Sequence, residues 1–430
     1  MADESRQMMV PDRERLPILV FFHGHALAHT IRPLVVARAL RARGYPVILA
    51  GSGKHSTRVV EEGFDYRDIE TMPQERMDEF VLVRGRDDYH DTRWVERLVH
   101  VERGLMREIE PRLVIVDQRR TVRLSAAFEG VDQMEICNGY LQPGAPGLGA
   151  DRPSIARRWR SKAPFVRVGM RHAAEYKPTH RLALMADVPE FYPPGTAAGA
   201  PGWHYVGPLL DSSQPQSRID CLDEGWDTSR PLVYLTIGSS GRSAEYLEGM
   251  VEAFAGSPYR LVITTAGRAR VSSAHDNVRV FDYLPGELIL ARADVLVGVT
   301  GIGAIYQALR CGKPVIGVPE HADQRIHLGR VETLGLGRML AREEFTPSAV
   351  LRAVDALMVD CEPLGARCRA FAEHLRGWDG GEAAADVVDG HLSSGRPARL
   401  DRLGRSLRRY AALVRMTPLR WINPRSHRRP

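Results

Sequence analysis

The sequence predicts an α/β protein built from two doubly wound, parallel-sheet domains. Short apolar strands alternate with helical patterns of roughly 10–15 residues in both halves of the chain. A chain of 430 residues, of which 44% are hydrophobic, is long enough for two separate cores. Glycine turns and polar side chains follow several strands, which is where open α/β sheets bind ligands. We therefore expect two Rossmann-like domains that face a central cleft.

The first domain is expected over residues 17–212, after a disordered segment at 1–16. An apolar strand at 17–23 leads into a helix with apolar residues at helical spacing, and a glycine ends that helix before the next strand. This βαβ unit begins a parallel sheet, which strands at 112–117 and 133–138 extend.

Residues 213–230 are predicted to link the domains. The second domain is expected over 231–392, where strands and helices alternate again and helices at 347–358 and 363–377 close the unit. An Arg-rich tail follows at 393–430.

Composition narrows the classes of function. Five scattered cysteines form no Cys-x-x-Cys pair, so we expect neither a disulfide framework nor a zinc knuckle, and we expect a cytoplasmic protein. The net charge of +6 comes from residues 396–430, which hold 11 arginines and one acid, so the rest of the chain is slightly acidic. We therefore expect no nucleic-acid partner. The first apolar run breaks at His23 and is too short for a signal peptide, and no segment is long enough to span a bilayer.

The stretch 299–332 carries the strongest functional signal. Gly301 and Gly303 lie in a turn between an apolar strand and a helix, and Asp323 and Gln324 follow the next strand. A glycine turn that opens a helix directs free backbone N–H groups toward an anion. Polar residues at the end of the next parallel strand lie over the same crevice. The pattern predicts a site that holds a diphosphate beside a polar group such as a sugar.

This stretch resembles the family 1 nucleotide-sugar-dependent glycosyltransferases of the bacterial natural-product type, whose fold is called GT-B. The resemblance extends over about residues 17–380 and includes segments 25–53, 136–143, 204–210 and 232–241. It implies an acceptor-binding first domain, a donor-binding second domain, and a late helix that crosses back onto the first domain.

An inverting sugar transfer needs a base for the acceptor hydroxyl, and histidine suits this task near neutral pH. The loop after the first strand offers His23, His25 and His29. The resemblance implies that His29 is the catalytic base, with His25 as the second candidate. The alternative is that all three are polar loop residues bonded to backbone groups.

Polar residues at two further strand ends face the same crevice. Asp117 ends a parallel strand, and in similar enzymes an aspartate in this place orients the base; the alternative is a cap for the following turn. Asn138 and Tyr140 follow the next strand and, with His25, are predicted to contact the acceptor, although a turn role is equally open for Asn138 and Tyr140.

On the donor side, Gly238, Ser239 and Ser240 follow the first strand of the second domain. Glycine permits close approach of the backbone, and the serines offer hydroxyl donors to phosphate; a plain strand-to-helix turn is the alternative. Tyr283 is predicted either to stack on a pyrimidine base or to pack in the core.

The phosphate turn departs from the family pattern His-Gly-Gly-x-Gly-Thr. The aligned residues run from Val299 to Ala304, so the phosphate-binding histidine and the helix-opening threonine are both missing. Backbone N–H groups remain, and Thr300 can supply one hydroxyl. Two alternatives follow: another donor, Arg268, His327 or Ser240, replaces the missing contacts, or the diphosphate is bound more weakly.

The resemblance implies that Asp323 and Gln324 bind hydroxyls of the donor sugar. His321 and His327 lie close to Asp323 in sequence, but their spacing matches no standard ligand pattern, and similar enzymes generally need no bound metal. We therefore expect no metal and no cofactor besides the nucleotide sugar as co-substrate.

The tail has apolar residues at helical spacing over 400–414, with arginines between them and Trp421 near its end. Such a helix can lie on an anionic membrane surface; a helix packed against the body and a disordered tail are the alternatives.

The sequence thus predicts an inverting glycosyltransferase that moves a sugar from UDP or dTDP to a hydroxyl of a small, hydrophobic acceptor. One alternative is another reaction on the same fold, either transfer to a lipid-linked glycan or epimerisation of a nucleotide sugar. An alternative from another class is a non-catalytic binding partner with a degenerate phosphate site.

Overall fold

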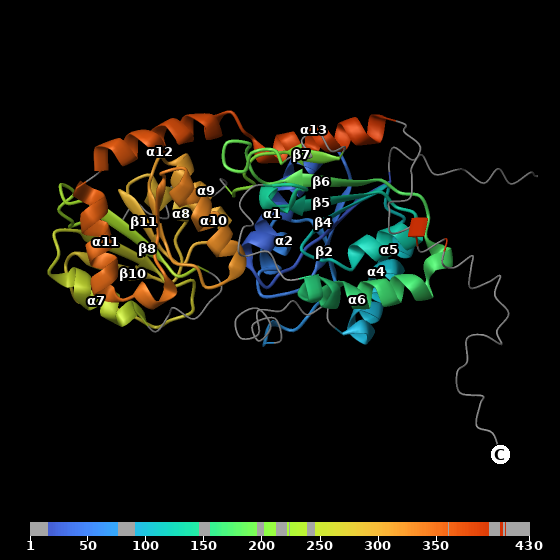
Figure 1. Cartoon of the computed structure of the whole chain (residues 1–430), viewed down its shortest axis with the longest axis horizontal. Coiled ribbons are helices and arrows are strands. Elements are labelled where there is room, and N and C mark those ends of the chain that lie inside the picture. The colour runs from blue at the N-terminus through green and yellow to red at the C-terminus, as the bar shows by residue number, and fades with distance from the viewer. Residues whose placement is uncertain are drawn as a thin grey trace, which may run out of the picture.

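The computed structural model describes residues 16–75, 91–145, 155–195, 202–211, 224–238, 246–359 and 361–394, together with residues 222, 405, 406 and 409. Ser239, Ser240, the first 15 residues and nearly all of the Arg-rich tail lie outside these ranges. Two α/β domains lie side by side along the long axis of the molecule (Figure 1). Within the described ranges, no helix combines the length and the apolar character needed to cross a bilayer.

The first domain contains a seven-stranded sheet in which every pairing is parallel, in the order β3-β2-β1-β4-β5-β6-β7. The strands are β1 (Ile18–Phe21), β2 (Val47–Gly51), β3 (Asp65–Asp68), β4 (Leu113–Asp117), β5 (Gln133–Cys137), β6 (Arg181–Met185) and β7 (Trp203–Tyr205). The helices are α1 (Leu27–Ala42), α2 (Thr57–Glu61), α4 (Thr92–Ile109), α5 (Val122–Glu129) and α6 (Ile155–Arg171).

Strand β1 is apolar along its whole length because both faces of the sheet are covered. Ile18 and Val20 point into a core that α1 completes, whereas Leu19 and Phe21 point into a second core that α4 and α5 complete. Side chains alternate between faces along a strand, so these four residues contribute to both layers of the domain.

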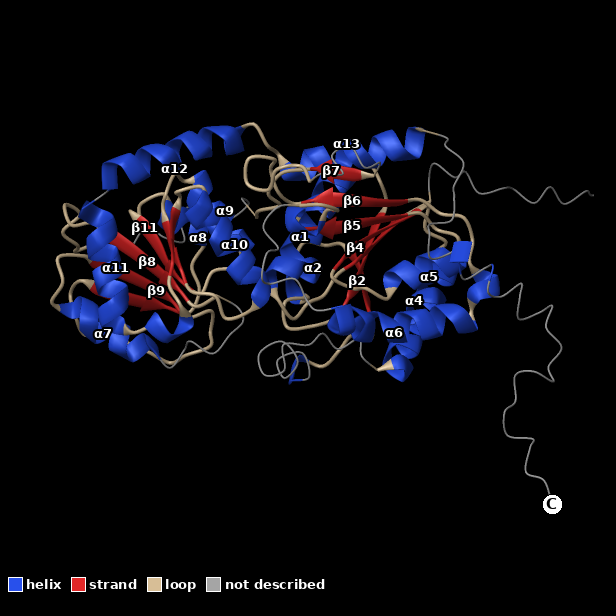
Figure 2. Cartoon of the chain, in the orientation of Figure 1, coloured by secondary structure: helices blue, strands red, loops and turns tan. Residues whose placement is uncertain are grey.

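The second domain contains a six-stranded parallel sheet in the order β10-β9-β8-β11-β12-β13, which is the strand order of a dinucleotide-binding fold. Figure 2 shows helices on both sides of this sheet. Its strands are β8 (Leu232–Thr236), β9 (Arg260–Thr264), β10 (Val278–Phe281), β11 (Val295–Gly298), β12 (Val315–Gly317) and β13 (Gly337–Met339). Helices α7 (Leu247–Ala255) and α11 (Pro347–Val359) cover one face; α8 (Gly286–Leu290), α9 (Ile302–Arg310), α10 (Ala322–Thr333) and α12 (Cys361–Arg376) cover the other. The predicted pair of doubly wound domains is confirmed.

The last long helix, α13 (Gly380–Ser393), belongs structurally to the first domain, although the division made from the sequence placed residues 380–392 in the second. Ala384, Ala385 and Val388 lie in the same core as α1. Arg43 at the end of α1 donates to Asp386 at 2.8 Å and to Asp389 at 2.6 Å. Helices α12 and α13 follow one another along one side of the molecule, so the chain crosses back just before α13 (Figure 1).

A buried carboxyl joins the two domains. Asp187, which follows β6, accepts hydrogen bonds from the backbone N–H of Gly139 at 2.6 Å and from the hydroxyl of Tyr306 in α9 at 2.8 Å. Burial raises the pKa of Asp187 from 3.8 to about 7, although both bonds favour its charged form.

This pKa predicts a pH-dependent stability. The folded-state value lies above the unfolded value, so the stabilising contribution of Asp187 is fully present below about pH 4 and is lost as the pH rises to about 7. Relative to Asp187→Asn, the wild-type free energy of unfolding should fall by up to about 1.4 kcal/mol per pH unit in this window. Urea unfolding of both proteins between pH 5 and 7.5 measures the difference. A constant difference would show that Asp187 does not titrate there.

Candidate active site

An imidazole and a carboxylate meet at the carboxyl edge of the first sheet. His29 lies in the first turn of α1, and Asp117 ends β4, the neighbour of β1. The Nδ1 atom of His29 lies 3.0 Å from Oδ1 of Asp117. The Asp117 side chain is fully buried, whereas that of His29 is 30% exposed. With its proton on Nδ1, the ring keeps a lone pair on Nε2, so the pair has the geometry of a base oriented by a carboxylate.

The other two loop histidines have different surroundings. The Nε2 atom of His25 contacts the backbone carbonyl oxygen of Met72. His23 is buried, with its ring centroid 4.8 Å from that of His25. Burial, aided by the nearby His29, lowers the pKa of His23 to about 3, so this ring is neutral at physiological pH. Within the described part of the chain, only His29 of the three contacts a carboxylate.

Arg32, which was not among the predicted site residues, bonds to the same carboxylate. Its Nε and Nη2 atoms donate to the two oxygens of Asp117, each at 2.7 Å, and its Nη1 atom donates to Oδ1 of Asn138 at 2.6 Å. Burial alone would raise the pKa of Asp117, but the charges of Arg32 and His29 outweigh it and hold the pKa below its usual value. His29 and Arg32 lie one helical turn apart, and this spacing is the feature of the sequence that could have pointed to Arg32.

A buried hydrogen-bond chain continues from Arg32 into the second domain. The Nδ2 atom of Asn138 lies 3.3 Å from Nε2 of His327 in α10, and the Tyr192 hydroxyl lies 2.7 Å from Nδ1 of the same ring. Both polar atoms of Asn138 therefore bond within the protein, which favours a linking role over the predicted acceptor contact. His327 is fully buried, and burial lowers its pKa to about 4. Since both ring nitrogens are engaged, His327 does not replace the missing phosphate histidine.

Tyr140, the other predicted acceptor residue of this loop, packs with its ring centroid 5.4 Å from that of His327.

A cavity of about 810 Å³ lies between the domains. Tyr283, at its wall, is 42% exposed and is therefore not a core residue. The guanidinium of Arg58 lies 5.2 Å from the Tyr283 ring centroid. Residues of both domains line the cavity, among them Ile31, Arg32, Lys54 and Arg58 from the first, and Tyr234, Gly238, Tyr283, Gly286, Gly301 and Gly303 from the second.

The glycine turn before α9 faces this cavity. A Cβ added at Gly301 or Gly303 would meet no atom within 4 Å, so open space lies over the start of the helix. Gly238 has a positive φ of 64°, and an added Cβ would lie 3.0 Å from the carbonyl oxygen of Val299. Glycine thus permits the close approach of the two donor-side turns. Beside them, Oγ1 of Thr300 is buried and has no hydrogen-bond partner among the described residues.

Because its hydroxyl has no partner in the described part of the chain, Thr300→Val is predicted to raise stability and to lower affinity for a nucleoside diphosphate. Removing a buried, unsatisfied hydroxyl should raise the free energy of unfolding by about 1 kcal/mol. If the hydroxyl donates to the diphosphate, affinity for a nucleoside diphosphate should fall about tenfold. Calorimetric titration and urea unfolding measure the two quantities.

Thr265→Val is the matched control for this stability gain. The buried Thr265 hydroxyl donates to Oδ1 of Asp282 at 3.1 Å, so its loss should reduce stability. Unchanged nucleotide affinity in Thr300→Val would mean that Thr300 does not contact phosphate.

The predicted sugar-binding pair begins α10. The Asp323 carboxylate contacts Nδ1 of His321. Partial burial disfavours the charged carboxylate, but the bond from His321 outweighs burial and lowers the pKa of Asp323. Gln324 is buried, and its Oε1 atom accepts the backbone N–H of Glu320 at 2.7 Å. This bond fixes the amide so that its NH₂ group is left to donate to a ligand.

Comparison with known proteins identifies the family. Residues 258–376 match the family described as erythromycin biosynthesis protein CIII-like, C-terminal domain. The chain is 30% identical over 381 residues to the PGL/p-HBAD biosynthesis glycosyltransferase of Mycobacterium tuberculosis (strain ATCC 25177 / H37Ra), covering 82% of this chain and 87% of that protein. The chain belongs to the family 1 glycosyltransferases.

This glycosyltransferase is also 30% identical over 368 residues to the PGL/p-HBAD biosynthesis rhamnosyltransferase of Mycobacterium bovis (strain BCG / Pasteur 1173P2), covering 79% of this chain and 80% of that protein. Among solved structures it resembles CalG4, the calicheamicin glycosyltransferase, with a TM-score of 0.66, 19% identity, and coverage of 89% and 100% of the two chains. It also resembles the spinosyn rhamnosyltransferase SpnG in complex with thymidine diphosphate, with a TM-score of 0.65, 16% identity, and coverage of 87% and 100%. These structures have the GT-B fold, which confirms the predicted fold class.

Proposed function

We propose that this glycosyltransferase inverts the anomeric centre while moving a sugar from a nucleoside diphosphate to a hydroxyl of a small, hydrophobic acceptor. His29 pairs with Asp117 on one domain, and other residues of the same helix (Leu27, Ala28, Ile31 and Arg32) line the cavity together with the open glycine turn of the other domain. This arrangement carries the proposal. The Nε2 atom of His29 takes the hydroxyl proton as the acceptor oxygen attacks the anomeric carbon. The bond from that carbon to the diphosphate breaks on the opposite side, and Asp117 stabilises the resulting imidazolium.

The diphosphate would lie at the start of α9. Backbone N–H groups of a helix N-terminus favour an anion, and the cavity wall adds the cationic side chains of Lys54 and Arg58 from the facing domain. These cations can compensate for the missing phosphate histidine without a metal ion. The Tyr283 ring, which is 42% exposed and has the Arg58 guanidinium 5.2 Å from its centroid, would stack on the nucleotide base with its other face. The thymidine diphosphate complex of a structural neighbour supports dTDP, and UDP is the second candidate.

The sugar would lie between the two domains, with its hydroxyls bonded to Asp323 and Gln324. A charged carboxylate and a fixed amide NH₂ group offer an acceptor and a donor side by side. Because a relative is named a rhamnosyltransferase, a deoxyhexose is the first sugar to test.

The acceptor is expected to bind on the first domain, near His25 and Tyr140. A structural neighbour is described in complex with spinosyn aglycone, and two relatives are named for PGL/p-HBAD biosynthesis. These names support a hydrophobic acceptor, carried by a lipid or free. A lipid-borne acceptor would suit a cytoplasmic enzyme whose Arg-rich tail touches an anionic membrane.

Transfer is favoured over the alternatives, because the relatives and structures described above are named as transferases and not as epimerases or binding proteins. The deciding test is product formation. The protein is incubated with dTDP-rhamnose or UDP-glucose, with and without a phenolic or macrolide acceptor, and free nucleoside diphosphate is measured. Release only in the presence of acceptor, with inversion at the anomeric carbon by NMR, is expected. Release without acceptor, isomerised donor or retained configuration would each contradict the proposal.

A further inference from the structure

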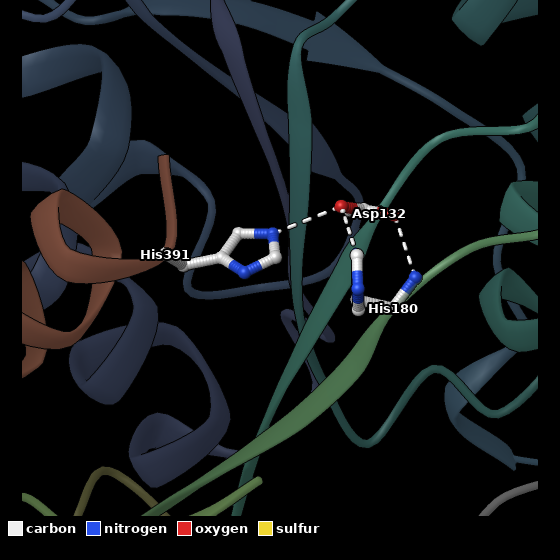
Figure 3. A group of neighbouring side chains, drawn as sticks. All are labelled: Asp132, His180 and His391. Carbon is white, nitrogen blue, oxygen red and sulfur yellow. Dashed lines mark hydrogen bonds and ion pairs between the residues drawn. The ribbon is translucent and has the colours of Figure 1, made fainter. Parts of the chain in front are cut away.

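A second polar cluster lies at the edge of the first sheet opposite to the catalytic pair. Asp132 directly precedes β5, His180 directly precedes β6, and His391 lies in the last turn of α13 (Figure 3). Asn138, which bonds to Arg32, follows β5 at its other end. The full length of a strand therefore separates this cluster from the catalytic edge.

The three side chains converge on one carboxylate oxygen. The Nδ1 atom of His180 and the Nε2 atom of His391 each lie 2.9 Å from Oδ2 of Asp132, and the three atoms lie within 4.8 Å of one another. The other oxygen, Oδ1, accepts the backbone N–H of His180 at 2.6 Å, which fixes the orientation of the carboxylate (Figure 3). The side chains are 10–26% exposed, so solvent and ions can reach them.

We propose that Asp132, His180 and His391 bind one divalent transition-metal ion, and that Zn²⁺ fits them best. Two imidazole nitrogens and one carboxylate oxygen are the ligand types that Zn²⁺ prefers among abundant ions, with water as the fourth ligand. In a tetrahedral zinc site the ligand atoms lie about 3.3 Å apart. The two observed separations of 2.9 Å from Oδ2 of Asp132 would each lengthen slightly. The protons on the facing nitrogens would move to the other ring nitrogens or leave to water.

Such an ion would be structural and not catalytic. It would join the starts of two strands to a helix that follows more than 200 residues later in the chain. The sequence carries no local signal for it, because no two of the three residues are neighbours. The proposal departs from the expectation, drawn from the sequence, that the protein holds no metal; that expectation weighed only the histidines around Asp323.

The same geometry fits a metal-free trio in which Asp132 accepts a hydrogen bond from both rings. The two arrangements differ in their response to metal. Untagged, chelator-treated protein is titrated with ZnCl₂ by calorimetry and with CoCl₂ by visible absorption. We expect one ion per chain, the strong d–d bands of tetrahedral cobalt, and a higher melting temperature at saturating Zn²⁺.

The variants identify the ligands. His391→Gln keeps a side-chain donor for Asp132 but removes a good metal ligand, so the fold is retained while metal affinity falls by about tenfold or more. His180→Gln should behave in the same way. His374→Ala, which removes an exposed histidine of α12, should bind metal as the wild type does. Absence of saturable one-ion binding, or equal affinity in wild type and His391→Gln, would overturn the proposal.

Discussion

Replacing His29 with alanine is expected to reduce turnover by about 10²–10⁴-fold and to leave nucleotide affinity unchanged. The reason is positional: His29 lies in the acceptor domain and contacts Asp117, whereas the nucleotide is expected at the turn before α9. Turnover is measured as acceptor-dependent release of nucleoside diphosphate, and affinity is measured by titration with dTDP and UDP.

His25→Ala is the matched control, because it removes a ring from the same loop. His25 faces the Met72 carbonyl and no carboxylate among the described residues, so its loss should mainly raise KM for the acceptor. Turnover that survives in His29→Ala and disappears in His25→Ala would reverse the assignment of the base.

Arg32→Met is expected to lower the free energy of unfolding by about 3–5 kcal/mol. The substitution leaves Asp117 fully buried without the guanidinium that now donates to both of its oxygens. Arg38→Met is the control on the same helix, since Arg38 is 25% exposed and pairs with Glu62 and Asp211. Asp211 keeps a second cation, Arg58, at 3.7 Å, so no lone buried charge remains and the loss should cost about 1 kcal/mol. Urea unfolding of both variants at pH 7 makes the comparison. Equal losses of the free energy of unfolding in the two variants would show that burial of the Arg32–Asp117 pair does not increase its contribution to stability.

Arg32→Met should also change the dependence of kcat/KM on pH. Arg32 helps to hold the pKa of Asp117 below its usual value, so the stabilisation from the charged carboxylate is present above the unfolded pKa and is lost as the pH falls through the folded pKa. Without Arg32, Asp117 takes up a proton at a higher pH. The acid limb of kcat/KM should therefore move upward in Arg32→Met and stay in place in Arg38→Met.

A double variant separates the effect of the lone buried charge on stability from the effect of lost packing. Arg32→Met combined with Asp117→Leu removes both charges together and should recover much of the stability lost in Arg32→Met, because no lone buried ion remains. A further loss in the double variant would mean that the guanidinium acts mainly through Asn138.

The sequence was sufficient to predict how His29 and Asp117 meet. Adjacent parallel strands end at the same edge of a sheet, so a residue in the first turn of the helix after β1 and the last residue of β4 are brought together by topology alone. The glycine turn and the Asp323–Gln324 pair follow from the same rule in the second domain.

Other contacts depend on how separate elements approach one another. The bond between Asn138 and His327 exists only because the two sheets face each other in one particular way, and no spacing within the chain encodes that orientation. The cluster of Asp132, His180 and His391 likewise requires α13 to return to the first domain. Arg32 was missed for a different reason: arginines are mostly exposed, whereas this helix turns Arg32 inward.

The return of α13 makes the second domain an insertion within the first, and the two places where the chain passes between them are neighbours. An added Cβ at Gly207 would lie 2.8 Å from Cβ of Trp378, and one at Gly380 would lie 2.4 Å from the carbonyl oxygen of Pro208. Two adjacent connections act as a hinge: they allow rotation of the domains about one axis and resist rotation about the others. Rotation about that axis would widen the gap for spent nucleotide to depart, and it would break the buried bonds from Asp187 to Tyr306 and from Asn138 to His327.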